Sequence, residues 1–102
     1  MFQDSAWKTP ALRRLARIFL SIDKEEDLLN FLRDLCTRDE LVELSQRWKI
    51  AELLAAGHLY RSIAAKTKVS TTTVTRIAEW LEHGTGGYRA TLKKINKQSK
   101  RQ

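Results

Sequence analysis

Hydroxyl-bearing and basic side chains gather in one short stretch of the chain. The stretch holds Lys66, Lys68, Ser70, Thr71, Thr72, Thr73, Thr75 and Arg76. Hydroxyl groups hydrogen-bond to phosphates and base edges, threonine methyls contact the thymine methyl, and lysine and arginine neutralise phosphates. Threonine is an indifferent helix former, so four threonines within five residues indicate a contact surface. We therefore predict that these side chains contact nucleic acid; the alternative is that they only cap and fill the start of a helix.

Residues 60–81 have the pattern of a helix-turn-helix motif, in which two helices pack across a short turn. Ser70 is suited to cap the second helix, whose N-terminal residues would then lie at a major groove. Lys68 occupies the turn position where glycine is usual, and a left-handed conformation there costs on the order of 1 kcal/mol. The residues that we expect to face the core are Ile63, Ala64, Val69, Val74, Ile77 and Leu81. This spacing turns the threonines outward.

The chain has a net charge of +7, and its positive charge is concentrated in the second part of the sequence. Residues 1–57 contribute −1, from nine Lys and Arg against ten Asp and Glu. Residues 58–102 contribute +8, from ten Lys and Arg against two Asp and Glu. Such a region attracts a polyanion, because neutralised phosphates release their counterions. For the basic residues near the C-terminus, a tail that only aids solubility is the alternative.

Other elements of the chain are also expected to be helical, because apolar residues recur at helical spacing and strand alternation is lacking. One proline and four glycines leave few breaks. The first helix should begin at Thr9 with Pro10 at its first position. The second should begin with Asp23 as its cap. The third should begin with Thr37 as its cap and end at Gly57.

The third expected helix is apolar around much of its circumference. One face carries Leu41, Leu44, Trp48, Ala51 and Ala55, and a second carries Val42, Ile50, Leu53 and Leu54. A helix of this kind must be covered on several sides. In a chain of 102 residues, a second copy of the chain is the expected cover. We therefore predict a homodimer.

Several functional classes are disfavoured by the residue types that are missing. The single cysteine, Cys36, excludes an internal disulfide and offers no metal cluster. The two histidines, His58 and His83, are isolated, and no serine or cysteine has a recognisable base partner. No apolar run approaches the ~20 residues that span a bilayer, and the N-terminus lacks a secretory pattern. We therefore expect that the protein is not an enzyme and that it binds no metal, cofactor or membrane. We expect it to be located in the cytoplasm.

An ordered set of residues makes the chain resemble the Trp-repressor family. The set comprises Thr37-Arg38-Asp39-Glu40, Arg47-Trp48-Lys49-Ile50, Glu52, Leu54, Gly57 and Thr73-Val74-Thr75-Arg76. The segment from Gly84 to Arg89 resembles the related branch that does not respond to tryptophan. The resemblance implies an intertwined, all-helical homodimer with two helix-turn-helix units. It also implies a near-palindromic operator in double-stranded DNA, with half-sites about 34 Å apart.

The resemblance also points to a small-molecule pocket. Arg47 and Arg76 match two arginines that flank the ligand in tryptophan-responsive members, and Thr37 matches a position near it. Arginine suits a carboxylate because its fork makes bidentate hydrogen bonds. Ile77 and Trp80, however, stand where those members have a glycine and a small polar residue. We therefore expect no tryptophan corepressor and a space filled by the chain's own side chains.

An alternative role for Arg47 is an ion pair with Glu43, four residues earlier on the same helix. For Arg76, contact with phosphate is the favoured role.

Taken together, these patterns predict one all-α DNA-binding domain over residues 1–88 and a basic tail over residues 89–102. The tail is expected to be a short helix that frays into a disordered arm. The predicted function is sequence-specific binding of double-stranded DNA by a helix-turn-helix regulator acting as a repressor. The alternatives are a helical, dimeric protein-interaction module and a non-specific binder of DNA or RNA.

Overall fold

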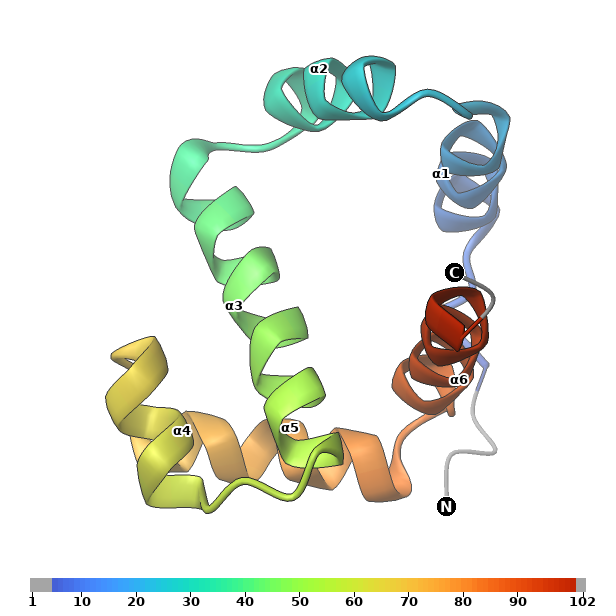
Figure 1. The fold of residues 1–102 in the computed structure, drawn as a ribbon. Coiled ribbons are helices and arrows are strands. Elements are labelled where there is room, and N and C mark those ends of the chain that lie inside the picture. Colours follow the sequence, from blue (N-terminus) through green and yellow to red (C-terminus); the bar gives the residue numbers. More distant parts are fainter. Residues whose placement is uncertain (1–4, 101–102) are drawn as a thin grey trace. The chain divides into compact units, whose positions relative to one another are not determined.

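The computed structural model describes residues 5–100, and for residues 99 and 100 only the backbone. Within this range the chain forms six α-helices and no strand (Figure 1). The helices are α1 (Pro10–Ser21), α2 (Glu25–Leu35), α3 (Arg38–Ala55), α4 (Tyr60–Thr67), α5 (Thr71–His83) and α6 (Gly87–Lys100). The predicted all-α fold is confirmed. The chain divides into two compact units, residues 1–42 and 43–102, which we describe separately.

Two helix starts follow the predicted capping pattern. Thr9 caps α1 by accepting a hydrogen bond from the Leu12 amide at 3.1 Å, and Pro10 occupies the first helical position. At the start of α3, the Thr37 amide donates to Glu40 Oε1 at 2.8 Å, and the Glu40 amide donates to Thr37 Oγ1 at 3.1 Å. This reciprocal pair is a capping box, which satisfies two amides that a helix start otherwise leaves open.

The start of α2 differs from the prediction. Lys24, in extended conformation, is the N-cap residue and makes no side-chain capping hydrogen bond, so the cap predicted at Asp23 is wrong. Asp23 precedes the cap position by one residue. The acidic residues Glu25, Glu26 and Asp27 occupy the first turn instead. Negative charge there interacts favourably with the helix dipole, which supports the start of the helix without a cap.

The end of α3 is formed by Gly57, as predicted. Its φ of 88° lies in the left-handed region. The Gly57 amide donates to the Leu54 carbonyl at 3.0 Å, and the His58 amide donates to the Leu53 carbonyl at 3.1 Å. These two bonds are those of a Schellman motif, which satisfies the last carbonyls of a helix. The chain thereby turns out of α3 toward the helix-turn-helix segment.

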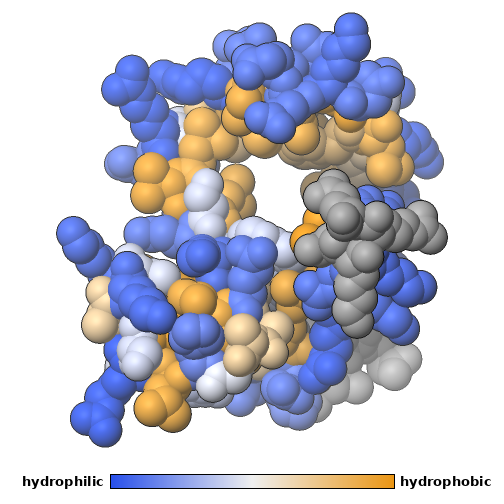
Figure 2. All heavy atoms as spheres, viewed as in Figure 1, coloured by the Kyte–Doolittle hydropathy of each residue, from blue (hydrophilic) through white to orange (hydrophobic). Residues whose placement is uncertain are grey.

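The first unit, residues 1–42, leaves most of its apolar surface open. Phe19 of α1 and Phe31 of α2 pack edge to face, with ring centroids 5.5 Å apart. Neither α1 nor α2 contains a buried residue. The exposed large apolar side chains of this unit are Trp7, Leu12, Leu20, Leu29, Leu35 and Val42. Apolar side chains are visible on the surface in Figure 2. The single chain therefore provides no core for these two helices.

The second unit, residues 43–102, contains the core. Its cluster of buried side chains joins three helices and consists of Ile50, Ala51, Ile63, Val74 and Ile77. Each large side chain buried in this way contributes about 1.5–3 kcal/mol relative to an exposed one. Val69 and Ala64 pack against the same cluster, as the motif predicts. The core thus fixes α4 and α5 to the second half of α3.

Helix α6 packs against the other helices of the second unit at its N-terminal end. Tyr88 stacks on Trp48 of α3 with ring centroids 6.4 Å apart. Arg89 donates from Nε to the Leu81 carbonyl at 2.9 Å and from Nη2 to Glu82 Oε2 at 3.0 Å. The segment predicted as a basic tail is therefore helical through residue 100, and residues 101–102 lie outside the described residues. The domain limits remain a prediction.

Candidate nucleic-acid interface

The turn between α4 and α5 contains a left-handed residue. Lys68 has φ 60° and ψ 34°, the only non-glycine residue with positive φ among those that the structure describes. The Val69 amide donates to the Ala64 carbonyl at 3.3 Å, which closes the end of α4. A left-handed lysine costs on the order of 1 kcal/mol. The left-handed conformation is the one expected from the sequence. The Lys68 side chain is exposed, so its charge lies in solvent.

Ser70 begins α5 as its N-cap residue, as predicted. Its Oγ accepts a hydrogen bond from the Thr73 amide at 3.2 Å and lies 3.1 Å from Thr73 Oγ1. The cap satisfies one open amide of the helix start. On the opposite side, Val74 and Ile77 are buried in the core. The cap and the core together determine where α5 begins and which face it turns outward.

The threonines of α5 fall into two groups. Thr71, Thr72 and Thr75 are exposed, whereas Thr73 is half-buried and shares its hydroxyl with Ser70. Thr75 Oγ1 donates to the Thr71 carbonyl at 2.9 Å. The side chains of Thr71 and Thr72 make no hydrogen bond within residues 5–98. The outward surface at the start of α5 therefore consists of three threonines, not the predicted four.

The basic side chains of the motif are all exposed. Lys66 Nζ lies 3.4 Å from His58 Nδ1, and Lys68 extends from the turn. Arg76 forms no ion pair with any described residue. These three cations and the three outward threonines form the interface that we propose below. Their side chains are accessible to a polyanion.

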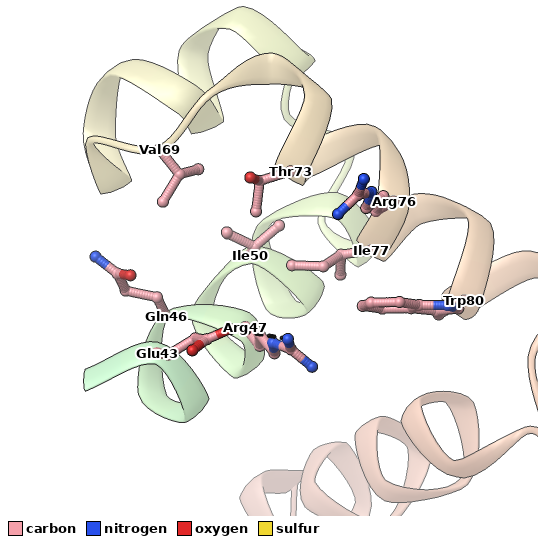
Figure 3. Close-up of a pocket in the computed structure, with 9 residues that line it drawn as sticks. All are labelled: Glu43, Gln46, Arg47, Ile50, Val69, Thr73, Arg76, Ile77 and Trp80. Atoms are coloured by element: carbon pink, nitrogen blue, oxygen red, sulfur yellow. Dashed lines mark hydrogen bonds and ion pairs between the residues drawn. The ribbon is translucent and has the colours of Figure 1, made fainter. Parts of the chain in front are cut away.

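A pocket lies behind this interface, between the middle of α3 and the inner face of α5 (Figure 3). Its volume is about 110 Å³, and it is lined by Glu43, Gln46, Arg47, Ile50, Val69, Thr73, Arg76, Ile77 and Trp80. Of the predicted pocket residues, Arg47, Arg76, Ile77 and Trp80 are thus brought together. Thr37 does not line the pocket; it belongs to the first unit, where it caps α3.

Arg47 has two partners within the chain. Its Nη2 forms an ion pair with Glu43 Oε1 at 2.9 Å, which was the alternative to a ligand role. Its guanidinium carbon also lies 5.3 Å from the centre of the Trp80 ring. A cation over an aromatic face is attracted by the ring's quadrupole. The pocket is therefore occupied on one side by an internal contact between α3 and α5.

Gln46 is a residue of this region that the sequence analysis did not single out. Its Nε2 donates to the Thr67 carbonyl at 3.3 Å and so connects α3 to the last residue of α4. The available signal was its spacing of one turn from Ile50, which places both on one face of α3.

Within the described residues, no group of three or more His, Cys, Asp or Glu side chains is arranged to hold a metal ion.

These features define an all-α helix-turn-helix protein: a short helix, a left-handed turn, and a capped second helix with polar residues outward. The family model of the Trp repressor protein matches residues 11–96, and the chain belongs to this family. The uncharacterised protein YerC of Bacillus subtilis (strain 168) is 33% identical over 84 residues, which cover 82% of this chain and 81% of YerC.

Two solved structures are also similar over most of their length. A TrpR-like protein from Eubacterium eligens ATCC 27750 has a TM-score of 0.85 and 32% identity, covering 91% of this chain and 96% of that one. A candidate Trp repressor from Staphylococcus aureus has a TM-score of 0.85 and 30% identity, covering 94% and 96%. These relatives agree with the related branch of the family that the sequence resembles.

The family is a regulatory DNA-binding family rather than an enzyme family. The predicted family and the predicted helix-turn-helix fold are therefore confirmed. Across the part of the chain that the structure describes, no helix combines the length and apolar character needed to cross a membrane.

Proposed function

We propose that this protein binds double-stranded DNA sequence-specifically, as a cytoplasmic homodimer, and represses transcription at its operator. The observation that carries the proposal is the N-terminal half of α5, where exposed Thr71, Thr72, Thr75 and Arg76 stand opposite buried Val74 and Ile77. The major groove admits a helix, and its base edges offer donors, acceptors and thymine methyls. The rigid core beneath α5 presents these side chains at its N-terminal end, where recognition helices contact bases.

Charge supports DNA as the partner. Residues 58–102 carry a net charge of +8, and Lys66, Lys68 and Arg76 are exposed beside the proposed reading surface. Phosphate contacts of this kind position a protein on the duplex, and base contacts specify the sequence. A module that only binds other proteins has no need for this combination.

The open apolar surface supports a homodimer. Helices α1 and α2 contain no buried residue, and Val42 and Leu44 of α3 are 56% and 51% exposed. Covering these side chains with a second copy removes apolar area from water and completes a core that the single chain lacks. Two motifs related by a twofold axis then match a near-palindromic operator with half-sites about 34 Å apart.

The pocket between α3 and α5 supports the absence of a tryptophan corepressor. Its volume of about 110 Å³ is smaller than the roughly 150 Å³ of an engineered cavity that takes up benzene. Trp80 and Ile77 line it, and Glu43 already pairs with Arg47. Titration calorimetry with L-tryptophan should therefore show no binding; micromolar affinity would contradict this part of the proposal.

Recovery and sequencing of genomic fragments bound by the purified protein, at about 150 mM salt, tests the proposed function. We expect one enriched near-palindrome with half-sites one helical turn apart. Uniform recovery of all fragments would contradict sequence-specific binding and favour a purely electrostatic mode. Transcription in vitro from a promoter that contains the enriched site should fall when the protein is added, and a rise would contradict repression.

A further inference from the structure

The contact between Arg47 and Trp80 joins α3 to α5 beyond the edge of the buried core. Val74, Ile77 and Ala78 are buried, so the core holds α5 as far as residue 78, but Trp80 is 42% exposed. The Arg47 guanidinium lies over the ring of Trp80, 5.3 Å from its centre (Figure 3). This contact is therefore an attachment of α5 to α3 that lies beyond the buried core residues.

Glu43 holds the arginine side chain in place for this contact. Its carboxylate lies one turn earlier on α3 and pairs with Arg47 at 2.9 Å. The two side chains are 62% and 42% exposed, so solvent weakens the ion pair as a source of stability. Its effect is to restrict the rotamers of Arg47, which lowers the entropy lost when the guanidinium settles on the Trp80 ring.

We propose that Glu43, Arg47 and Trp80 form a clasp that sets the angle of α5 against α3. The inference rests on the proposed function, because the clasp would act by positioning Thr71 and Thr72 on the operator. Reading groups must be held to about 0.5 Å, and a helix attached at two points along its length resists tilting better than one attached only in the core. Because all three side chains belong to the chain, α5 is held without a small molecule.

The clasp also separates two like charges. Arg47 and Arg76 both line the pocket, and the unpaired guanidinium of Arg76 would be repelled by a free Arg47. Figure 3 shows the two side chains on opposite sides of Ile77. With Arg47 kept on Trp80, Arg76 is available for phosphate. In this scheme Glu43, Arg47 and Trp80 are positioning residues that need not touch DNA.

The test compares operator DNA with scrambled DNA at one salt concentration, using full-length wild type, Arg47→Gln, Trp80→Leu and the double variant. Each single substitution should weaken operator binding by about two- to fivefold, the range of an exposed cation–π contact. Binding to scrambled DNA should change by less than about twofold. The double variant should be no weaker than the single ones, because all three lose the same contact.

Conservative variants distinguish positioning from folding. Arg47→Lys keeps a cation and Trp80→Phe keeps a ring, so both should recover most of the operator affinity. Lys49→Gln removes an exposed charge from α3 outside the clasp and serves as the matched control. Additive losses, equal losses on both DNAs, or no recovery by the conservative variants would overturn the clasp.

Two further outcomes separate the inference from the proposed function. A wild-type protein that binds both DNAs equally contradicts the proposed function, and the clasp with it. A selective wild-type protein whose variants stay equally selective overturns the clasp alone. Tighter operator binding by wild type upon addition of L-tryptophan would show that the pocket takes a ligand, and would also overturn the clasp.

Discussion

The hydroxyl groups at the start of α5 differ in whether their protons are free. A hydroxyl has one proton to donate. Thr75 uses its proton on the Thr71 carbonyl, and Thr73 shares its hydroxyl with Ser70. Thr71 and Thr72 have no such partner among the described residues and are exposed. Their hydroxyls can therefore donate to a base edge, whereas Thr75 offers DNA mainly its methyl group.

Replacing Thr72 with valine should weaken operator binding, because valine has nearly the same shape but no hydroxyl. A hydrogen bond of ordinary strength corresponds to about a five- to tenfold loss of affinity. Fluorescence anisotropy with labelled operator measures the change. Thr75→Val is the matched control and should stay within about twofold, since its proton is already bound to the helix. Equal losses in the two variants would contradict this division of the threonines.

Lys68 is expected to have opposite effects on the stability of the fold and on the affinity for DNA. Its left-handed backbone favours glycine, so Lys68→Gly should stabilise the fold by up to about 1 kcal/mol and raise the thermal midpoint. The same change removes the phosphate contact that we propose for Lys68 and should reduce the slope of log affinity against log salt by about 0.9. Lys68→Ala keeps the backbone strain, so it should reduce the slope of log affinity against log salt without stabilising the fold. An unchanged slope in both variants would show that Lys68 does not contact DNA.

At the scale of single elements, α5 depends on its cap. Ser70 satisfies the Thr73 amide, so Ser70→Ala should destabilise the protein by about 1 kcal/mol. Thermal unfolding followed by circular dichroism detects the change. Ser62 is exposed within α4, and Ser62→Ala should be neutral or slightly stabilising because alanine is the better helix former. A similar loss in both variants would mean that the cap contributes nothing specific.

At the scale of the whole molecule, the buried side chains all lie in one unit, whereas exposed apolar side chains occur in both. The core residues Ile50, Ala51, Ile63, Val74, Ile77 and Ala78 all belong to residues 43–102. Residues 1–42 contribute none of them. A unit with open apolar faces and no core of its own is expected to gain stability only when another surface covers it. For this reason we expect folding and assembly to be linked.

Val42 is a sensitive probe of that linkage. In an isolated chain its side chain is 56% exposed, so Val42→Lys should be nearly neutral. In a dimer that covers this face, a buried unpaired charge should cost several kcal/mol and dissociate the protein in sedimentation experiments. The thermal midpoint of wild type should also rise with protein concentration. A concentration-independent midpoint together with an unaffected variant would contradict the dimer.

The sequence by itself determined the features that depend on neighbouring residues. The caps at Thr9, Thr37 and Ser70, the glycine stop at Gly57 and the strained turn at Lys68 each involve groups within about five positions, so local spacing was sufficient to predict them. The cap of α2 was predicted at Asp23, one residue before the observed N-cap Lys24, because three consecutive acids support this helix start without a capping side chain. Periodicity also identified Ile63, Val74 and Ile77 as core residues.

Only the tertiary structure decided which partner is contacted by each residue at the edge of a helix's buried face. Thr73 lies beside the inward stripe of α5, and the packing of α3 against that stripe turns it into the pocket. The contact of Arg47 with Trp80 and the bond from Gln46 to Thr67 join residues far apart in the sequence. Helical spacing assigns a residue to a face, but the distance between two faces depends on how all the core side chains pack together. That distance determines whether the pocket is open to a ligand or closed by the chain itself.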